Sequence, residues 1–200
     1  INRISMGLQS ANNRELKMLG RIHTYEEFLH NYDLVRKGGI ENVNVDLMSA
    51  LPGQTVSDWE RTLKEILKLR PEHISAYSLI IEEGTPFYQT YEEDEQRREE
   101  GEEPKYLPNE ETEREMYRLT GALLEEKGYM QYEISNYAKK GRECQHNIGY
   151  WTRKNYLGLG LGSASLVENV RFSNTSDLQE YLAGDFEERE REVLERREQM

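Results

Sequence analysis

One acidic residue stands near the end of a predicted strand, where a ligand could reach it. The segment Asn42–Met48 alternates apolar and polar side chains, which is the two-residue period of a strand. Pro52-Gly53 favours a turn and stops that strand. Asp46 is therefore expected near the carboxyl end of a buried strand, the edge at which parallel α/β folds bind ligands. Its carboxylate either faces a ligand there or only caps a turn.

A thiol and an imidazole stand two residues apart, at Cys144 and His146. A structural zinc site needs four ligands, usually in two pairs, and the sequence has no second cysteine. A Cys/His hydrolase also needs an orienting Asn or Asp and an oxyanion hole, which no spacing indicates. His146 is thus either a hydrogen-bonded structural residue or a ligand. Tyr150 and Trp151 beside it suit a flat apolar ligand, and a neutral imidazole is a good ligand for iron.

Two further features bear on cofactor binding. Arg21 follows a predicted short helix and is a surface arginine unless the nearby rim holds a carboxylate, which arginine binds in bidentate fashion. The run Gly158-Leu-Gly-Leu-Gly-Ser163 resembles a dinucleotide fingerprint only loosely. That motif opens a helix and needs glycine where Ser163 stands. We interpret residues 156–167 as a strand with one bare face instead.

The elements that must position these residues alternate between strands and helices in the first half of the chain. Strands are predicted over 3–8, 42–48 and 73–81, and the helices between them are capped by Asn12 or Asn13, by Thr24 with Glu27, and by Thr55 or Ser57. Strand, helix, strand at this spacing is typical of a parallel sheet. Right-handed crossovers then bring the three strand ends to one rim.

The second half of the chain has a more varied pattern. Pro86 can begin a helix, the charge run 92–103 reads as a solvated excursion, and a long helix is expected from Pro108 to Gly128. The remaining expectations are a strand over 129–134, a loop-rich stretch over 135–151, a strand over 156–167 paired with 170–174 through a hairpin at Glu168-Asn169, a short helix ending at Gly184, and a charged helix or tail over 185–200.

Composition excludes some classes of function. The formal net charge of −12 argues against a nucleic-acid partner, which requires a basic face. No apolar run reaches the length of a membrane span, about 18 residues. A single cysteine cannot form an internal disulfide, so we expect a reducing, cytoplasmic location. The chain begins with Ile1 almost inside a strand and stops within a charged pattern, so we expect an internal piece of a longer protein.

Several collinear motifs resemble the barrel core of the oxygen-independent coproporphyrinogen oxidase family of radical S-adenosylmethionine (SAM) proteins. They are Ser5–Ser10, Gly20-Arg21, Asn44–Thr55, Pro71–Leu79 and Tyr132–Ala138. The run His146-Asn-Ile-Gly-Tyr-Trp151, with Tyr156–Gly160 after it, resembles the signature of the heme chaperone branch of that family. The resemblance covers about residues 1 to 182 and most of the tail.

The resemblance implies a partial (β/α) barrel that binds S-adenosylmethionine against a [4Fe-4S] cluster. By position, Arg21 matches the residue for the methionyl carboxylate, Asp46 the residue for the ribose hydroxyls, and Gln9 a residue for polar groups of the cofactor. Met48 and Ile80 stand where members of the family pack around the adenosine.

The resemblance also implies a second ligand and one large departure. His146 matches the histidine implicated as a heme ligand in the chaperone branch. The Cys-x-x-x-Cys-x-x-Cys motif that holds the cluster is absent from the chain, and Cys144 cannot replace it. That motif would lie upstream of Ile1 and the family's C-terminal domain beyond Met200. We therefore expect no cluster ligand and no catalytic residue in this chain, which alone should be inactive.

These observations together predict an α/β fold, the C-terminal half of a partial radical SAM barrel followed by a small α+β extension. Residues 1–107 would form the partial barrel with its acidic excursion, 108–184 the extension, and 185–200 a truncated charged helix or tail. The function implied is a heme chaperone that binds heme and delivers it to an acceptor hemoprotein. The alternative is an oxygen-independent coproporphyrinogen III oxidase that uses a 5′-deoxyadenosyl radical. Exposed barrel edges lead us to expect self-association, such as a homodimer.

Overall fold

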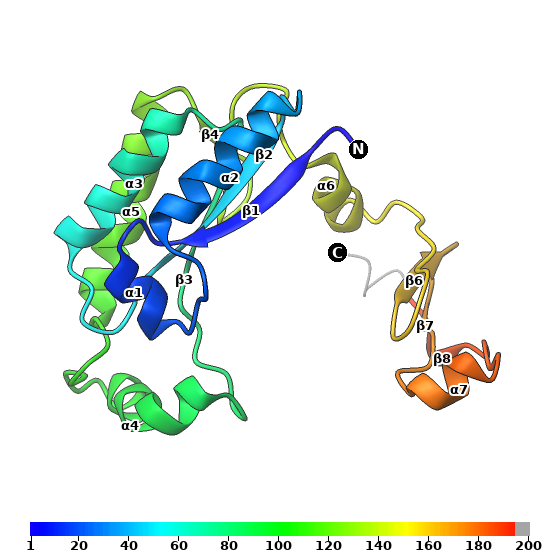
Figure 1. Ribbon diagram of the computed structural model, residues 1–200. Coiled ribbons are helices and arrows are strands. Elements are labelled where there is room, and N and C mark those ends of the chain that lie inside the picture. Colours follow the sequence, from blue (N-terminus) through cyan, green and yellow to red (C-terminus); the bar gives the residue numbers. More distant parts are fainter. Residues whose placement is uncertain (195–200) are drawn as a thin grey trace. The chain divides into compact units, whose positions relative to one another are not determined.

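The computed structural model describes residues 1–194 of the 200-residue chain. The chain divides into two compact units (Figure 1), the first covering Ile1–Glu143 and the second beginning at Cys144. We call them the first and second units and describe each by itself. In the described residues, no helix is both long enough and apolar enough to cross a membrane.

The first unit is built on a sheet whose strands order as β1-β2-β3-β5-β4. Strands β1 (Ile4–Gln9), β2 (Val43–Ser49) and β3 (His73–Ser78) are parallel, and the short strands β5 (Asn136–Ala138) and β4 (Met130–Gln131) continue the sheet in antiparallel pairing. The predicted parallel sheet is confirmed. The predicted strand over 129–134 is wrong in its extent, because the chain turns back at residues 132–135 to form β5.

The helices of this unit begin where the sequence places their caps. Helices α1 (Asn13–Met18), α2 (Tyr25–Lys37) and α3 (Val56–Leu69) are capped by Asn12, Thr24 and Thr55, and α5 (Glu110–Glu126) by Asn109. Thr24 and Thr55 form full capping boxes, in which the N3 carboxylate also accepts the N-cap backbone N–H. These local bonds satisfy N–H groups that have no partner inside a helix.

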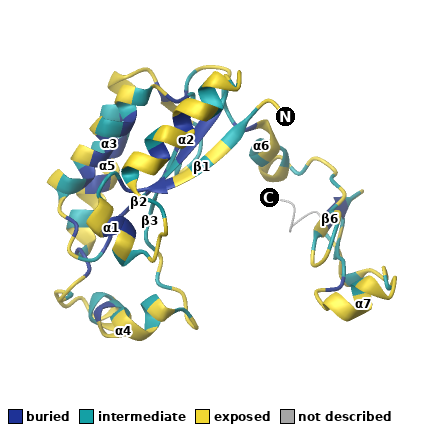
Figure 2. Ribbon diagram, in the orientation of Figure 1, coloured by how far each residue is buried: buried dark blue, intermediate teal, exposed yellow. Residues whose placement is uncertain are grey.

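One face of the sheet packs on helices and is apolar. Val43, Val45 and Leu47 of β2 are fully buried there, against Trp59 of α3 and Met116 of α5. Figure 2 shows the buried residues gathered on the strands and on the helix faces turned toward them. The indole Nε1 of Trp59 donates to Thr120 Oγ1 at 2.8 Å, so the largest core side chain has its polar atom satisfied.

The alternate residues of the same strands point to the other face, which is polar. Parallel register aligns Gly7, Asp46 and Ser75 across β1, β2 and β3, with Asn44 and His73 one row earlier. Because side chains of a strand alternate between faces, the apolar positions of β2 fix its polar positions on this second face. We call it the inner face of the first unit.

The charge run over 92–103 is mostly exposed, as predicted, but its first part is helical and one of its residues is buried. Helix α4 runs from Pro86 to Glu99 and carries Asp94, which is only 3% exposed. Its carboxylate accepts the backbone N–H groups of residues 105, 106 and 107 at 2.6–2.8 Å. Burial alone would raise the pKa of Asp94, but these bonds bring it below the ordinary value. The charge run therefore contains a buried anchor for the loop after it.

The second unit contains helix α6 (Gln145–Trp151) and a sheet ordered β6-β7-β8. Strands β6 (Ala164–Val167) and β7 (Val170–Ser173) form the predicted hairpin, with Glu168 and Asn169 at φ 50° and 67°. Helix α7 (Leu178–Leu182) follows. The sequence prediction is wrong at α6, which was expected to be loop, and at β8 (Arg189–Val193), expected to be helix or tail. Residues 195–200 of that tail lie outside the described part.

The predicted strand over 156–167 is largely wrong, because its first part runs as irregular chain. Tyr156 forms an isolated bridge with Leu166, and residues 157–163 are not in a strand. Gly158 passes so close to the chain that a Cβ there would lie 2.2 Å from the carbonyl oxygen of Ala164. Leu157 and Leu159 on either side of it are 65% and 85% exposed.

The bond between Trp59 and Thr120 gives a stability prediction. The substitution Thr120→Val keeps the shape of the side chain but leaves the buried indole N–H without its acceptor, which should lower the free energy of unfolding by about 1–3 kcal/mol. Thr90→Val is the matched control, because Thr90 makes the same bond to the carbonyl four residues earlier on an exposed helix face. Urea unfolding of both variants tests this, and equal losses would contradict it.

Candidate functional site

The inner face brings two of the predicted cofactor residues close to a third side chain. Gln9 ends β1 and is 5% exposed, and its Oε1 accepts a hydrogen bond from the Tyr77 hydroxyl at 3.0 Å. Asp46 lies on the same face of β2, and its negative charge acts on that hydroxyl. The three residues come from three adjacent parallel strands. Gln9 and Tyr77 lie at the carboxyl ends of their strands, whereas Asp46, predicted near such an end, is the middle residue of β2.

The backbone at the end of β1 is arranged to present Gln9. Its φ of 76° lies in the left-handed region, which a non-glycine residue rarely adopts, and the strand register shifts between Gly7 and Gln9. A Cβ on Gly7 would lie 3.1 Å from Gln9 Nε2. The bare glycine thus leaves room for the Gln9 amide to lie over its own strand. Unusual backbone of this kind is often found where a side chain must be held for binding.

Arg21 is exposed in the turn between α1 and α2, and its positive charge acts on the Tyr77 hydroxyl of the site. The pKa of Tyr77 is raised, first by burial and then by Asp46, while the hydrogen bond to Gln9 and the positive charge of Arg21 act in the opposite direction. The guanidinium is therefore within electrostatic reach of the same hydroxyl. Gln9 thus contacts Tyr77, and the charges of Asp46 and Arg21 act on its hydroxyl.

Two other predicted cofactor residues lie along the same strands. Met48 is half-buried, faces the inner side with Asp46 and pairs in register with Tyr77. Ile80 follows β3 by two residues and is 77% exposed, so its side chain is not packed against the site. An exposed isoleucine next to a binding face is available to cover an apolar part of a ligand.

The Asp46 carboxylate is held by neutral donors. Asn44 Nδ2 donates to its Oδ1 at 2.7 Å, and Ser5 Oγ donates to its Oδ2 at 2.9 Å. Asn44 Oδ1 in turn lies 2.6 Å from Nδ1 of His73, which is fully buried. Tyr132 Oη lies 2.6 Å from the other ring nitrogen of His73. A continuous polar chain therefore runs from Tyr132 to the carboxylate.

A buried glutamate joins the loops that follow β1 and β2. Glu15 Oε2 accepts from Ser10 Oγ at 2.5 Å and from Gln54 Nε2 at 2.9 Å. Ser10 belongs to the loop after Gln9, and Gln54 to the loop after β2. These bonds tie together the two loops at the carboxyl edge, so the rim beside the candidate site has a fixed shape.

His146 lies in the second unit, in the first turn of α6. It is exposed, its Nε2 is 3.2 Å from the Tyr150 hydroxyl, and its ring meets that of Tyr150 edge to face at 4.6 Å. Tyr150 stacks in the same way on Tyr156. The sequence pattern missed the helix, and of the two predicted aromatic neighbours, Tyr150 and Trp151, the contact with Tyr150 is present. An exposed imidazole beside aromatic rings can bind an iron-bearing flat ligand.

The chain's residues do not suit an iron–sulfur cluster. Such clusters are held by cysteine thiolates, usually four of them. Cys144 is the single cysteine, and it is buried. Among residues 1–194 there is no group of three or more His, Cys, Asp or Glu side chains that could hold a metal ion.

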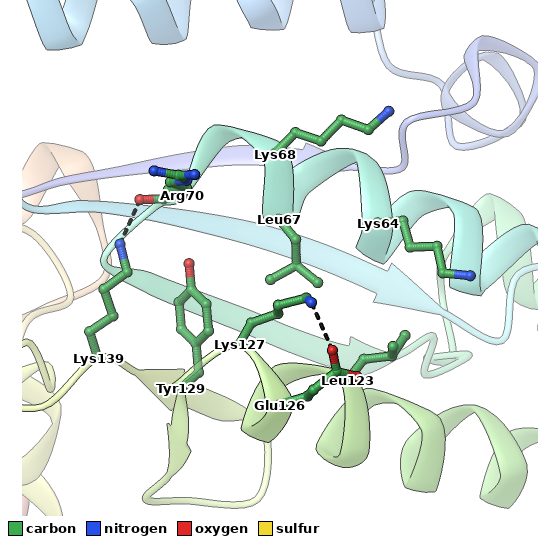
Figure 3. A pocket seen from close by; sticks show the side chains of 9 residues that line it. All are labelled: Lys64, Leu67, Lys68, Arg70, Leu123, Glu126, Lys127, Tyr129 and Lys139. Atoms are coloured by element: carbon green, nitrogen blue, oxygen red, sulfur yellow. Dashed lines mark hydrogen bonds and ion pairs between the residues drawn. The ribbon is translucent and has the colours of Figure 1, made fainter.

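A cavity of about 770 Å³ lies at the amino edge of the parallel strands, away from the candidate site (Figure 3). Leu67, Leu123 and Tyr129 form its apolar wall, and basic side chains line its rim. The rim lysines already bind carboxylates: Lys64 with Glu60, Lys68 with Glu65, Lys127 with Glu126 and Lys139 with Glu72. These ion pairs explain the cluster as surface charge on two helices and the strand ends beside them.

Sequence reasoning assigned no role to Tyr77, Asn44, Ser5 and His73. A signal for three of them was present, because Asn44 is two residues from Asp46, and His73 and Tyr77 alternate with apolar residues in a predicted strand. Placing these strands in register would have put them on the inner face. The contact between Tyr77 and Gln9 spans 68 residues and could not be read from local pattern.

Comparisons with known proteins show which proteins the chain resembles. Residues 1–66 match the radical SAM superfamily. The chain is 36% identical over 182 residues to the heme chaperone HemW of Bacillus subtilis strain 168, which covers 91% of this chain and 46% of that protein. It is 38% identical over 163 residues to a mitochondrial protein of Danio rerio, radical S-adenosyl methionine domain-containing protein 1, which covers 82% of this chain and 35% of that protein.

A solved structure has the same fold. Coproporphyrinogen III oxidase (HemN) from Escherichia coli, described as a radical SAM enzyme, superposes with a TM-score of 0.75 at 20% identity. The superposition covers 99% of this chain and 47% of that chain. The family resemblance of the sequence motifs and the predicted partial radical SAM fold are thereby confirmed. The chain spans less than half the length of the proteins compared above.

The buried imidazole of the site gives a pH prediction. Burial, with a smaller effect from Arg3, lowers the pKa of His73 to about 4, against an ordinary value of 6.5. The unfolded chain therefore binds a proton first as the pH falls. The stability that depends on a neutral His73 is complete above pH 6.5 and is lost between pH 6.5 and 4, by about 2 kcal/mol from pH 7.5 to 5.

Urea unfolding at pH 7.5 and pH 5 measures this loss. His73→Asn removes the titrating group and should reduce the difference between the two pH values by about 2 kcal/mol. His30→Asn, at an exposed position on α2, is the matched control and should leave the difference unchanged. An unchanged difference in the His73 variant would contradict the assignment.

Proposed function

We propose that the protein binds both S-adenosylmethionine and heme. The reason is that this chain is a homologue of the HemW heme chaperones and begins with part of a radical SAM domain. The cofactor would bind on the inner face of the first unit, and heme would bind at α6 of the second. The observation that carries the first half of the proposal is the Gln9–Tyr77 hydrogen bond on the face that Asp46 shares, with Arg21 within electrostatic reach.

The chemistry of the three groups suits the parts of S-adenosylmethionine. A guanidinium binds a carboxylate in bidentate fashion, so Arg21 would bind the methionyl carboxylate. A carboxylate with acceptor sites to spare binds neighbouring hydroxyl groups, so Asp46 would bind the ribose. Gln9, held by Tyr77, would bind other polar groups, and Met48 and Ile80 would pack against the adenine.

The role proposed for this chain is binding. A radical SAM cluster supplies the electron that cleaves the cofactor, but the described residues offer no set of thiolates for one. The residues of the first unit would instead orient the cofactor, with burial of Gln9 and Asn44 excluding water from one side of it.

Heme binding is proposed at the aromatic end of α6. The imidazole of His146 would ligate the heme iron, and the rings of Tyr150 and Tyr156 would contact the flat face of the porphyrin. The protein would then deliver heme to an acceptor hemoprotein. Self-association and a cytoplasmic location stay predictions from the sequence, and one relative is named as mitochondrial.

S-adenosylmethionine binding is expected to depend on the Asp46 charge. Asp46→Asn removes one acceptor and the negative charge, which should weaken binding by about 10- to 100-fold. Asp33→Asn is the control, because Asp33 forms an exposed ion pair on α2. Calorimetric titration of S-adenosylhomocysteine into the protein and both variants measures the three affinities to be compared. Equal affinity of all three proteins would remove Asp46 from the site.

Heme binding is expected to depend on His146. Titration of heme into the protein should give a shifted Soret band that is lost or displaced in His146→Ala and kept in the control His30→Ala, whose histidine is exposed on α2. An unchanged Soret band in the His146 variant would return this residue to a structural role.

Product analysis tests the alternative activity, coproporphyrinogen oxidation. The fold is shared with a coproporphyrinogen III oxidase, so porphyrin products are measured after incubation of the full-length protein, with its cluster, with coproporphyrinogen III, S-adenosylmethionine and a reductant. The chaperone proposal expects no conversion. Formation of protoporphyrinogen would contradict a function limited to heme delivery.

A further inference from the structure

We propose that Asn44 and His73 are positioning residues, which hold the Asp46 carboxylate in the orientation that binds the two hydroxyl groups of a ribose. The inference rests on the proposed S-adenosylmethionine site and extends it to residues that do not themselves touch the cofactor. It is carried by a chain of short hydrogen bonds across β1, β2 and β3, all made on the inner face.

The first step concerns the carboxylate itself. Asp46, Asn44 and Ser5 form a closed ring of hydrogen bonds. Both protons of the Asn44 amide are used, one on Asp46 Oδ1 at 2.7 Å and one on Ser5 Oγ at 2.7 Å, and the Ser5 hydroxyl donates to Asp46 Oδ2 at 2.9 Å. Each carboxylate oxygen thus takes up one donor, and each has a second lone pair. Two lone pairs on two oxygens match the two neighbouring hydroxyls of a ribose.

The second step concerns the amide orientation, which the ring requires. Asn44 must point its NH₂ group at Asp46 and its oxygen away. Its Oδ1 accepts from His73 Nδ1 at 2.6 Å and from Ser75 Oγ at 3.2 Å. If the amide were reversed, its oxygen would face a carboxylate oxygen and its NH₂ would face a ring N–H. His73 therefore selects the orientation that supports Asp46.

The third step concerns the tautomer of His73. For Nδ1 to donate, the neutral ring must carry its proton there, and Nε2 must accept. The Tyr132 hydroxyl lies 2.6 Å from Nε2 and supplies the donor. The ring is fully buried, and its low pKa keeps it neutral at physiological pH. A proton on Nδ1 favours the amide orientation of Asn44 described above, and that amide orients the carboxylate.

A purely structural role would make a different prediction. If these bonds only satisfied buried polar groups and joined the strands, their loss would weaken binding of every ligand of the site by the same factor. If they position Asp46, their loss would weaken mainly the contribution of the ribose hydroxyls to the binding affinity. The quantity that separates the two is the ratio of affinities for S-adenosylhomocysteine and for its 2′-deoxyribose analogue, measured calorimetrically with the whole protein.

The wild-type ratio is expected to be about 10 to 100. His73→Leu, which removes the donor, should lower it to about 1 to 3, whereas His73→Asn keeps a donor near the Nδ1 position and should retain most of the ratio. Asp46→Ala should also abolish the ratio, and adding His73→Leu to it should lower the ratio no further. An unchanged ratio in His73→Leu overturns the inference and leaves the binding site standing. No binding of either compound by the wild-type protein overturns the proposed site, and the inference with it.

A milder variant covers the event that His73→Leu does not fold. Tyr132→Phe removes only the hydroxyl that pairs with Nε2 of His73 and should lower the ratio at least about threefold. Its matched control is Tyr117→Phe, which removes a hydroxyl bound to Gln131 at the exposed surface. Nitrogen-15 chemical shifts of the His73 ring should report protonated Nδ1 in the wild type and a mixture in Tyr132→Phe. Protonated Nε2 in the wild type would overturn the inference without any ligand.

Discussion

The register of β2 between its two parallel neighbours is the constraint on which the first unit depends. Gly7, Asp46 and Ser75 share one row across the sheet, and Leu47 next to Asp46 is fully buried against the helices. Because side chains alternate, a shift of one residue would bury Asp46 among Trp59 and its neighbours and turn Leu47 toward the polar face. The hydrophobic core therefore holds the site in place from the opposite face of the sheet.

The inner face contains buried polar side chains and also the charged carboxylate of Asp46. Its polar atoms bind one another over short distances, and a network of this kind is stabilising only when its members are satisfied. Both donors to Asp46, Ser5 and Asn44, are neutral, so they orient the carboxylate without cancelling its charge. An arginine in either position would have neutralised the carboxylate and occupied it. The arrangement joins three strands and still leaves a negative group with acceptor sites.

The fold could be predicted from the sequence where neighbours along the chain decide it. The capping boxes at Thr24 and Thr55 and the turn at residues 168–169 depend on residues a few positions apart, and they were predicted. Features that need distant partners were not. Asp94 is buried only because a loop eleven to thirteen residues later closes on it. In the candidate site, the place of Asp46 on a strand of the parallel sheet was foreseeable, although it is the middle residue of β2 and not near its carboxyl end. The hydrogen bond between Tyr77 and Gln9 required the folded sheet.

The close passage of Gly158 beside Ala164 has a consequence for how related sequences should vary. Position 158 admits no side chain at all, so selection for folding alone suffices to keep it glycine. Leu157 and Leu159 flank it with 65% and 85% of their surface exposed, and folding places little demand on them. The rate of replacement at the two leucines can therefore be compared with the rate at the glycine between them. If the leucines are replaced as slowly over evolutionary time as the glycine between them, the restraint on them is exerted by something other than the fold of this chain.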